Sequence, residues 1–164
     1  MTESVDPAEI RRAAMYWLAR RDHSRQEIHR KLQKKFGAEL DTGPYLDWLE
    51  EHNFLNDARY IEVFLRSAIE RGHGLLRIRQ DLQQRGLDRQ RVEEALQALE
   101  VDWFALAAQL RQRRFGALPQ RADQKEKARQ LRFLQYRGFS ADQCFHALET
   151  DLSADSSPTG SGIR

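Results

Sequence analysis

The chain has 164 residues, of which 40% are hydrophobic and 32% charged, which is enough to bury a core while leaving a polar surface. The formal net charge of +2 says little about partners, and the single cysteine, Cys144, excludes an intramolecular disulfide framework. No apolar run approaches the roughly 20 residues that cross a bilayer, and the first residues lack a signal-peptide pattern. We therefore expect a cytoplasmic protein that does not enter a membrane.

The first third of the chain predicts three short amphipathic helices. Residues 8–20 carry apolar side chains at spacings of three and four, preceded by Asp6 as a candidate N-cap. A capping-box pattern at Ser24 opens a second helix, which ends at Gly37. A third helix is expected at about residues 44–51. None of these helices is long enough to bury much by itself, so we expect them to pack together.

The same arrangement recurs twice further along the chain. In the final helix, Phe145 and Leu148 are expected to point inward. The expected helices of these two copies run from Asn56 to Arg71, from Leu75 to Gly86, from Asp88 through Leu99, from Trp103 to Phe115, from Asp123 to Arg137, and from Ser140 onward.

An internal period supports a repeat architecture. The glycines that end the middle helix of each copy, Gly37, Gly86 and Gly138, are 49 and 52 residues apart. A period near 50 is typical of an array of supersecondary units. The predicted fold class is therefore all-α, with three tandem three-helix repeats of helix-turn-helix type. The predicted boundaries are 8–53, 54–101 and 102–150, followed by a disordered tail at 151–164, which is rich in Ser, Gly and Asp.

Charge is distributed in blocks along the chain. Residues 11–35 carry nine bases and two acids, residues 37–70 carry eight acids and two bases, and residues 111–137 carry nine bases and two acids. The blocks therefore sum to +7, −6 and +7. Such segregation can steer a polyanion or an acidic protein surface, whereas the simpler interpretation is a set of ordinary solvated helix faces.

No catalytic or cofactor pattern stands out in the sequence. The five histidines are scattered without metal-ligand spacing, and Gly72-His73-Gly74 is too short for a phosphate-binding loop. That segment is better interpreted as a tight turn between helices, and Cys144 as a small buried thiol. We expect a binding protein without enzymatic activity, metal or cofactor.

The aromatic residues support two interpretations. The three tryptophans fall near helix centres and are expected in the core. Phe133 and Tyr136 lie among arginines late in the chain, and such a mixture can hold single-stranded nucleic acid by stacking and phosphate contact. Packing of these two rings against a neighbouring helix is the alternative, and the sequence leaves both open.

Four segments together point to a known family. Residues 14–28 read Ala-Met-Tyr-Trp-Leu-Ala-Arg-Arg-Asp-His-Ser-Arg-Gln-Glu-Ile, and residues 54–60 read Phe-Leu-Asn-Asp-Ala-Arg-Tyr. Residues 72–86 follow the pattern Gly-x-Gly-x3-Ile-x3-Leu-x3-Gly, and residues 131–139 read Leu-Arg-Phe-Leu-Gln-Tyr-Arg-Gly-Phe. In this order, over about residues 8–149, the chain resembles the RecX family, regulators of the bacterial RecA recombinase.

The resemblance implies an elongated, curved repeat array that lies in the groove of the RecA–single-stranded DNA filament. It implies suppression of RecA ATPase, strand-exchange and co-protease activity, and so modulation of recombination and the SOS response to DNA damage. We also expect the chain to be a monomer. Weak contacts from each repeat would add up through avidity. With the apolar stripe of each middle helix turned inward, its basic side chains face outward. The candidate contacts to the filament or DNA are Arg20, Arg21, Arg25, Arg30, Lys31, Lys34, Arg77, Arg129 and Arg132.

Two other functions fit part of the pattern. A helix-turn-helix DNA-binding regulator would use the third helix of a repeat to contact bases, but these helices are rich in acidic residues, which disfavours groove insertion. A generic helical scaffold for protein partners would share every feature except the ordered family segments.

Overall fold

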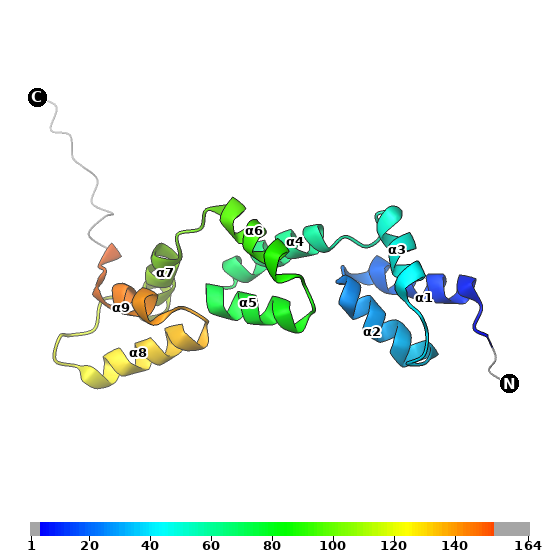
Figure 1. Cartoon of the computed structure of the whole chain (residues 1–164). Coiled ribbons are helices and arrows are strands. Elements are labelled where there is room, and N and C mark those ends of the chain that lie inside the picture. Colours follow the sequence, from blue (N-terminus) through cyan, green and yellow to red (C-terminus); the bar gives the residue numbers. More distant parts are fainter. Residues whose placement is uncertain (1–3, 153–164) are drawn as a thin grey trace, which may run out of the picture. The chain divides into compact units, whose positions relative to one another are not determined.

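A computed structural model describes residues 4–152, and this part of the chain contains nine α-helices and no strand (Figure 1). The all-α prediction is confirmed. None of the described helices is both long and apolar enough to cross a membrane. The helices are α1 (Pro7–Arg20), α2 (Arg25–Phe36), α3 (Gly43–Glu51), α4 (Asp57–Glu70), α5 (Leu75–Gln84), α6 (Arg89–Leu99), α7 (Trp103–Phe115), α8 (Gln124–Tyr136) and α9 (Ala141–Glu149).

The helix starts follow from local side-chain chemistry. The Asp6 side chain accepts a hydrogen bond from the Ala8 amide at 3.0 Å, which confirms it as the N-cap of α1. Ser24 and Glu27 form the expected capping box at α2, and Ser140 with Gln143 forms the same motif at α9. Each cap satisfies backbone amides that a helix start leaves without an intrahelical partner.

Contacts among the described residues group the helices into two compact units. Unit 1 comprises the residues up to Arg66 together with Gln80–Leu99, and unit 2 comprises Ser67–Arg79 and the residues from Glu100 onward. The boundary between them runs through α4 and α5, so the middle one of the three three-helix repeats contributes helices to both units. Unit 1 is built around a core of buried aliphatic side chains from α1, α2 and α3, namely Ile10, Ala14, Ile28, Leu32, Leu46 and Leu49, with Leu55.

Unit 2 has a core of smaller side chains. Its buried cluster contains Ala107, Ala108, Leu134, Phe139, Cys144 and Ala147. Cys144 is fully buried, as expected, and burial raises the pKa of its thiol to about 11, so it stays protonated near neutral pH. Leu152 also packs against this core, which places the first residues of the expected tail on unit 2. Residues 153–164 lie outside the described part.

Glycines allow the turns of unit 2 to approach each other closely. The Gly74 amide donates to the Arg137 carbonyl at 2.7 Å, and the Leu76 amide donates to the Gly138 carbonyl at 3.0 Å. A Cβ on Gly74 would collide with the Gly138 backbone, and Gly138 has a φ of +99°. Gly72-His73-Gly74 is thus an interhelical turn, as predicted, and it is fastened to the turn between α8 and α9.

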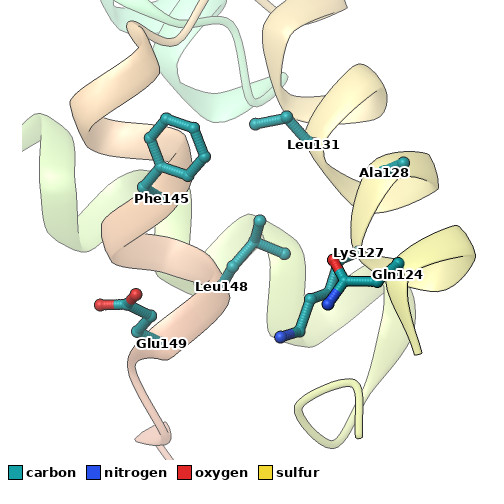
Figure 2. A pocket seen from close by; sticks show the side chains of 7 residues that line it. All are labelled: Gln124, Lys127, Ala128, Leu131, Phe145, Leu148 and Glu149. Carbon is teal, nitrogen blue, oxygen red and sulfur yellow. The ribbon is translucent and has the colours of Figure 1, made fainter. Parts of the chain in front are cut away.

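The expected inward position of Phe145 is wrong. Phe145 is 54% exposed, and the fully buried positions on α9 are Cys144 and Ala147. Figure 2 shows Phe145 and Leu148 directed from α9 toward Leu131 of α8, where they line a surface groove. The register of α9 differs from the expected one because small residues allow the helix to pack closely on the core, which leaves the large ring outside. The three tryptophans are only partly buried and pack against the edges of the two cores.

Candidate functional site

Three of the nine candidate contacts converge on one hollow in unit 1. The hollow has a volume of about 410 Å³ and lies where α1 ends and the chain turns into α2. Tyr16 and Arg20 are one helical turn apart on α1, so their side chains share a face. The hollow combines two aromatic rings, three basic side chains and one buried imidazole: Tyr16, Trp17, Arg20, Arg21, Lys31 and His23.

The cations of the hollow are held by neighbouring groups. Arg20 Nη1 donates to the Tyr16 hydroxyl at 2.8 Å, and its guanidinium lies 5.6 Å from the ring centroid. Lys31 Nζ lies 5.1 Å from the Trp17 ring centroid and 3.2 Å from Nε2 of His23. These contacts orient both cations without neutralising either charge.

His23 is 3% exposed and its bonding fixes its tautomer. Its Nδ1 lies 3.0 Å from the Arg21 carbonyl, which can only accept, so Nδ1 carries the proton. Nε2 is then free to accept from the Lys31 ammonium. Burial, followed by the nearby positive charges of Arg21 and Lys31, lowers the pKa of His23 below 6.5 despite the carbonyl contact and Glu27. The imidazole is therefore neutral at neutral pH.

Arg21 is paired with Glu27 at the rim of the hollow. Its Nη2 lies 3.0 Å from Oε2 of Glu27, while Nη1 donates to the Asp22 carbonyl at 2.9 Å. Burial alone would raise the pKa of Glu27, but hydrogen bonds from Tyr60, Arg21 and the Ser24 amide bring it below its usual value. The positive charge that remains for a ligand comes from Arg20 and Lys31.

Arg25 does not join this hollow, because it links α2 to α3. Its guanidinium lies 2.9 Å from Asp47 and 3.0 Å from Glu50, and only 33% of its side chain is exposed. Its backbone amide donates to Asp57 at 2.8 Å. Burial would lower the pKa of Arg25, but the hydrogen bonds that it donates to Glu50 and Asp47 raise it. The acidic side chains of α3 thus balance one of the nine cations.

Arg30 and Lys34 lie on an exposed part of α2. Arg30 Nη1 donates to the Gln84 carbonyl at 3.1 Å, near the end of α5 within unit 1. Lys34 is exposed and has no hydrogen-bond or ion-pair partner among the described residues. Both side chains are exposed, as expected. Lys31, which was also expected to point outward, is half-buried against Trp17.

In unit 2 the candidates lie on α8 and next to it. Arg129 and Arg132 line a shallow hollow on α8, and Arg129 pairs with Glu126 at 2.8 Å. This hydrogen bond is the main cause that lowers the pKa of Glu126 to about 2. The Arg129 guanidinium also lies 5.0 Å from the Phe115 ring centroid. Of the two cations, Arg129 is therefore already paired with a carboxylate.

The structure separates the two rings that the sequence left open. Phe133 packs against the core of unit 2 and meets Phe115 edge to face at 5.3 Å. Tyr136 is 78% exposed, and the guanidinium of Arg77 lies 5.8 Å from its ring centroid. Phe133 thus fits the packing interpretation, and Tyr136 remains available to a partner.

Arg111 has a role that charge counting missed. It belongs to the second basic block but is 1% exposed. Its guanidinium donates to the carbonyls of Gly116 and Ala117, at 3.0 and 3.4 Å, and lies 3.5 Å from Oε1 of Gln130. Burial lowers the pKa of Arg111, while Asp151 opposes this shift. A position in an apolar stripe with alanines at 107 and 108 was the signal for burial.

Within residues 4–152, no three His, Cys, Asp or Glu side chains are grouped so as to hold a metal ion. The arrangement of the described cations is suited to binding an anionic surface, and two regions offer it: the hollow and exposed face of α2 in unit 1, and the α8 surface in unit 2.

Comparison with known proteins assigns the whole arrangement to one family. Family models for the first, second and third three-helix domains of RecX match residues 11–40, 56–96 and 100–148. The protein named Regulatory protein RecX from Halorhodospira halophila is 47% identical over 145 residues, covering 87% of this chain and 89% of its own. The protein of the same name from Pseudomonas entomophila is 45% identical, covering 83% and 87%.

Solved structures support the same fold. The crystal structure of RecX from Lactobacillus salivarius has a TM-score of 0.71 at 21% identity and covers 86% of this chain and 93% of its own. A second structure, of the regulatory protein RecX, has a TM-score of 0.67. With three domain matches in order and relatives above 40% identity over most of their length, this chain belongs to the RecX family of regulatory proteins.

Proposed function

We propose that this chain binds the RecA filament assembled on single-stranded DNA and inhibits RecA recombinase, ATPase and co-protease activity. It acts in the cytoplasm as a monomer without catalytic activity of its own, and so modulates recombination and the SOS response. Family membership supports a regulatory role. The observation that carries the proposal is the gathering of exposed cations on the middle helices α2 and α8, where Arg30, Lys34 and Arg132 face solvent.

The acidic third helices argue against sequence-specific DNA recognition. On α3, Asp47, Glu50 and Glu51 are exposed, and Arg25 engages only the first two of them. A helix that presents carboxylates would be repelled by the phosphates that border a groove. The cations of α2 are therefore the favoured contacts with a polyanionic filament.

The test is RecA-catalysed, single-stranded-DNA-dependent ATP hydrolysis together with co-sedimentation of the chain with RecA filaments. The wild-type chain should co-sediment and slow hydrolysis, and both effects should weaken as salt rises, because phosphate contacts release counterions. The double variant Arg30→Glu, Lys34→Glu should bind and inhibit on the order of tenfold more weakly, because the two introduced carboxylates would repel the negatively charged filament.

The matched control is Arg12→Glu with Arg89→Glu, which changes the charge of unit 1 by the same amount at exposed positions of α1 and α6. Both double variants should melt close to wild type, since exposed substitutions usually change stability within about 0.5 kcal/mol each. Equal inhibition by wild type and the α2 variant would refute the role of this face. A wild-type chain that neither co-sediments nor slows hydrolysis would refute the function itself.

A further inference from the structure

The hollow of unit 1 has features that a general basic face does not need. It places two aromatic rings, Tyr16 and Trp17, beside two cations that have no carboxylate partner among the described residues, Arg20 and Lys31. A surface that only attracted negative charge at long range would need the cations alone. The rings beside the cations indicate a site for a specific group.

We propose that this hollow is a nucleotide subsite that binds single-stranded nucleic acid directly, with a base stacked on Tyr16 and a backbone phosphate on Lys31 and Arg20. This inference rests on the proposed function, because the RecA filament supplies the single-stranded DNA, and it adds the site at which the strand binds. Its volume of about 410 Å³ falls in the range of sites for small groups. Tyr16 is 60% exposed, so its ring is accessible to a base.

The hollow is preorganised for an anion. His23 accepts from the Lys31 ammonium through Nε2, so the lysine is positioned without losing its charge. The neighbouring Arg21 is already paired with Glu27 and completes the rim without demanding another counter-ion. A phosphate that enters therefore meets two oriented positive charges and displaces no ion pair.

An acidic peptide fits this geometry less well. Carboxylates and phosphates are both bound well by an arginine whose fork is free to donate two parallel hydrogen bonds. Here Arg20 uses Nη1 on the Tyr16 hydroxyl, and Arg21 uses Nη1 on the Asp22 carbonyl and Nη2 on Glu27. The cations therefore do not distinguish the two anions, and the distinction comes from the exposed Tyr16 ring, which offers a face to a base but little to a carboxylate.

The test measures binding of a short fluorescein-labelled oligothymidylate to the full chain by anisotropy, without RecA. Tyr16→Ala should weaken binding about tenfold, because stacking on one aromatic ring contributes that much per base. Tyr16→Phe keeps the ring and should bind within about twofold of wild type. Lys31→Gln should weaken binding and reduce the slope of log affinity against log salt by about one, the value for one lost phosphate contact.

The matched control is Phe145→Ala, which removes an exposed ring of unit 2 and should leave affinity unchanged. Circular dichroism and melting of every variant show that the fold is retained. Wild-type affinity in both Tyr16→Ala and Lys31→Gln would overturn the subsite. Loss with Lys31→Gln alone, together with displacement of the oligonucleotide by polyglutamate, would overturn the nucleic-acid assignment in favour of an acidic peptide.

The same variants in the RecA ATPase assay separate this inference from the proposed function. If wild type inhibits RecA and Tyr16→Ala binds the oligonucleotide normally, the subsite is wrong and the function stands. If wild type binds the oligonucleotide through Tyr16 and leaves RecA activity unchanged, the subsite stands and the function is wrong.

Discussion

The two basic blocks have the same net charge of +7 in the sequence, yet the two units use that charge differently. In unit 1, Arg20 and Lys31 are held over aromatic rings at a hollow and keep their charge available. In unit 2, Arg111 is buried as an internal hydrogen-bond donor and Arg129 pairs with Glu126. Equal charge counts therefore conceal unequal capacity to bind an anion.

The difference follows from what surrounds each cation. A guanidinium over a ring remains fully charged and is fixed in direction, whereas one that donates to several carbonyls inside a core contributes to folding. Unit 1 is thus the better candidate for specific contact, and unit 2 depends more on its basic residues for its own stability. Three perturbations test this contrast: the first two compare matched positions in the two units, and the third concerns unit 1 alone.

The largest effect is expected at the glycines that follow the middle helices. In unit 2, a methyl on Gly138 would lie 2.7 Å from the Arg77 backbone nitrogen, and φ is +99°. In unit 1, Gly86 has a φ of +77°, and an added methyl would lie 2.4 Å from Cβ and Cγ of Gln26, so this side chain would have to shift. Gly138→Ala should cost about 3 kcal/mol or more, because strain is combined with a clash against backbone, and Gly86→Ala about 2 kcal/mol, because a side chain can move more easily than a backbone.

Chemical denaturation with hydrogen-exchange readout of each unit measures these costs. Gly37→Ala is the control for strain alone, because φ is +114° and no atom lies within 4 Å of the added methyl. Equal destabilisation by Gly138→Ala and Gly37→Ala would show that the close backbone approach in unit 2 contributes nothing.

A smaller effect is expected from the two arginines that bridge elements. Arg111→Met removes a buried guanidinium and its charge-assisted hydrogen bonds to the Gly116 and Ala117 carbonyls, so it should cost about 2 kcal/mol. Arg25→Met in unit 1 removes ion pairs to partly exposed acids, Asp47 and Glu50, and should cost about 1 kcal/mol or less. Urea titrations of both variants measure the two losses in unfolding free energy, and the exposed Arg113→Met is the control. A larger loss for Arg25→Met than for Arg111→Met would contradict the assignment of Arg111 as the more important bridge.

The smallest effect is a pH dependence confined to unit 1. The pKa of His23 is lowered from 6.5 in the folded chain, so the unfolded chain binds more protons as pH falls below about 6.5. The stability of unit 1 should therefore decline progressively below that pH. Glu27 adds to the loss only at lower pH, since its unperturbed pKa is 4.5 and its folded value is below that.

Melting between pH 7 and pH 5 measures this decline, and His23→Gln should flatten it. An identical pH profile in wild type and His23→Gln would show that a group other than His23 causes the pH dependence of stability.

Most of the fold could be predicted from the sequence because its signals are local. Capping residues and the glycines after helices mark the ends, and apolar spacing identifies the buried faces, as for Ile28 and Leu32. The register of α9 could not be predicted, because Phe145 and Cys144 are adjacent and either could face the core. The outcome depended on how closely α9 approaches α7 and α8, which is a tertiary property.

The candidate site was predictable in composition but not in arrangement. Charge counting identified Arg20, Arg21 and Lys31, and the structure brings these three together. Charge counting could not reveal that Arg25 is paired with acidic residues of α3, since those residues are more than 20 positions away in the sequence. The contribution of Tyr16 was missed altogether, because an aromatic residue in an amphipathic helix is usually assigned to the core.

The division that passes through α4 and α5 has a consequence for how such a chain can change in evolution. The turn at residues 67–79 belongs to unit 2, where Gly72 contacts Leu110 and the Gly74 amide donates to Arg137. Removing the second repeat as a block would therefore deprive unit 2 of part of its own fold and unit 1 of α6. Repeats that arise by duplication are often exchangeable, but here the copies have become interdependent, so gain or loss of one repeat would require compensating changes in both units.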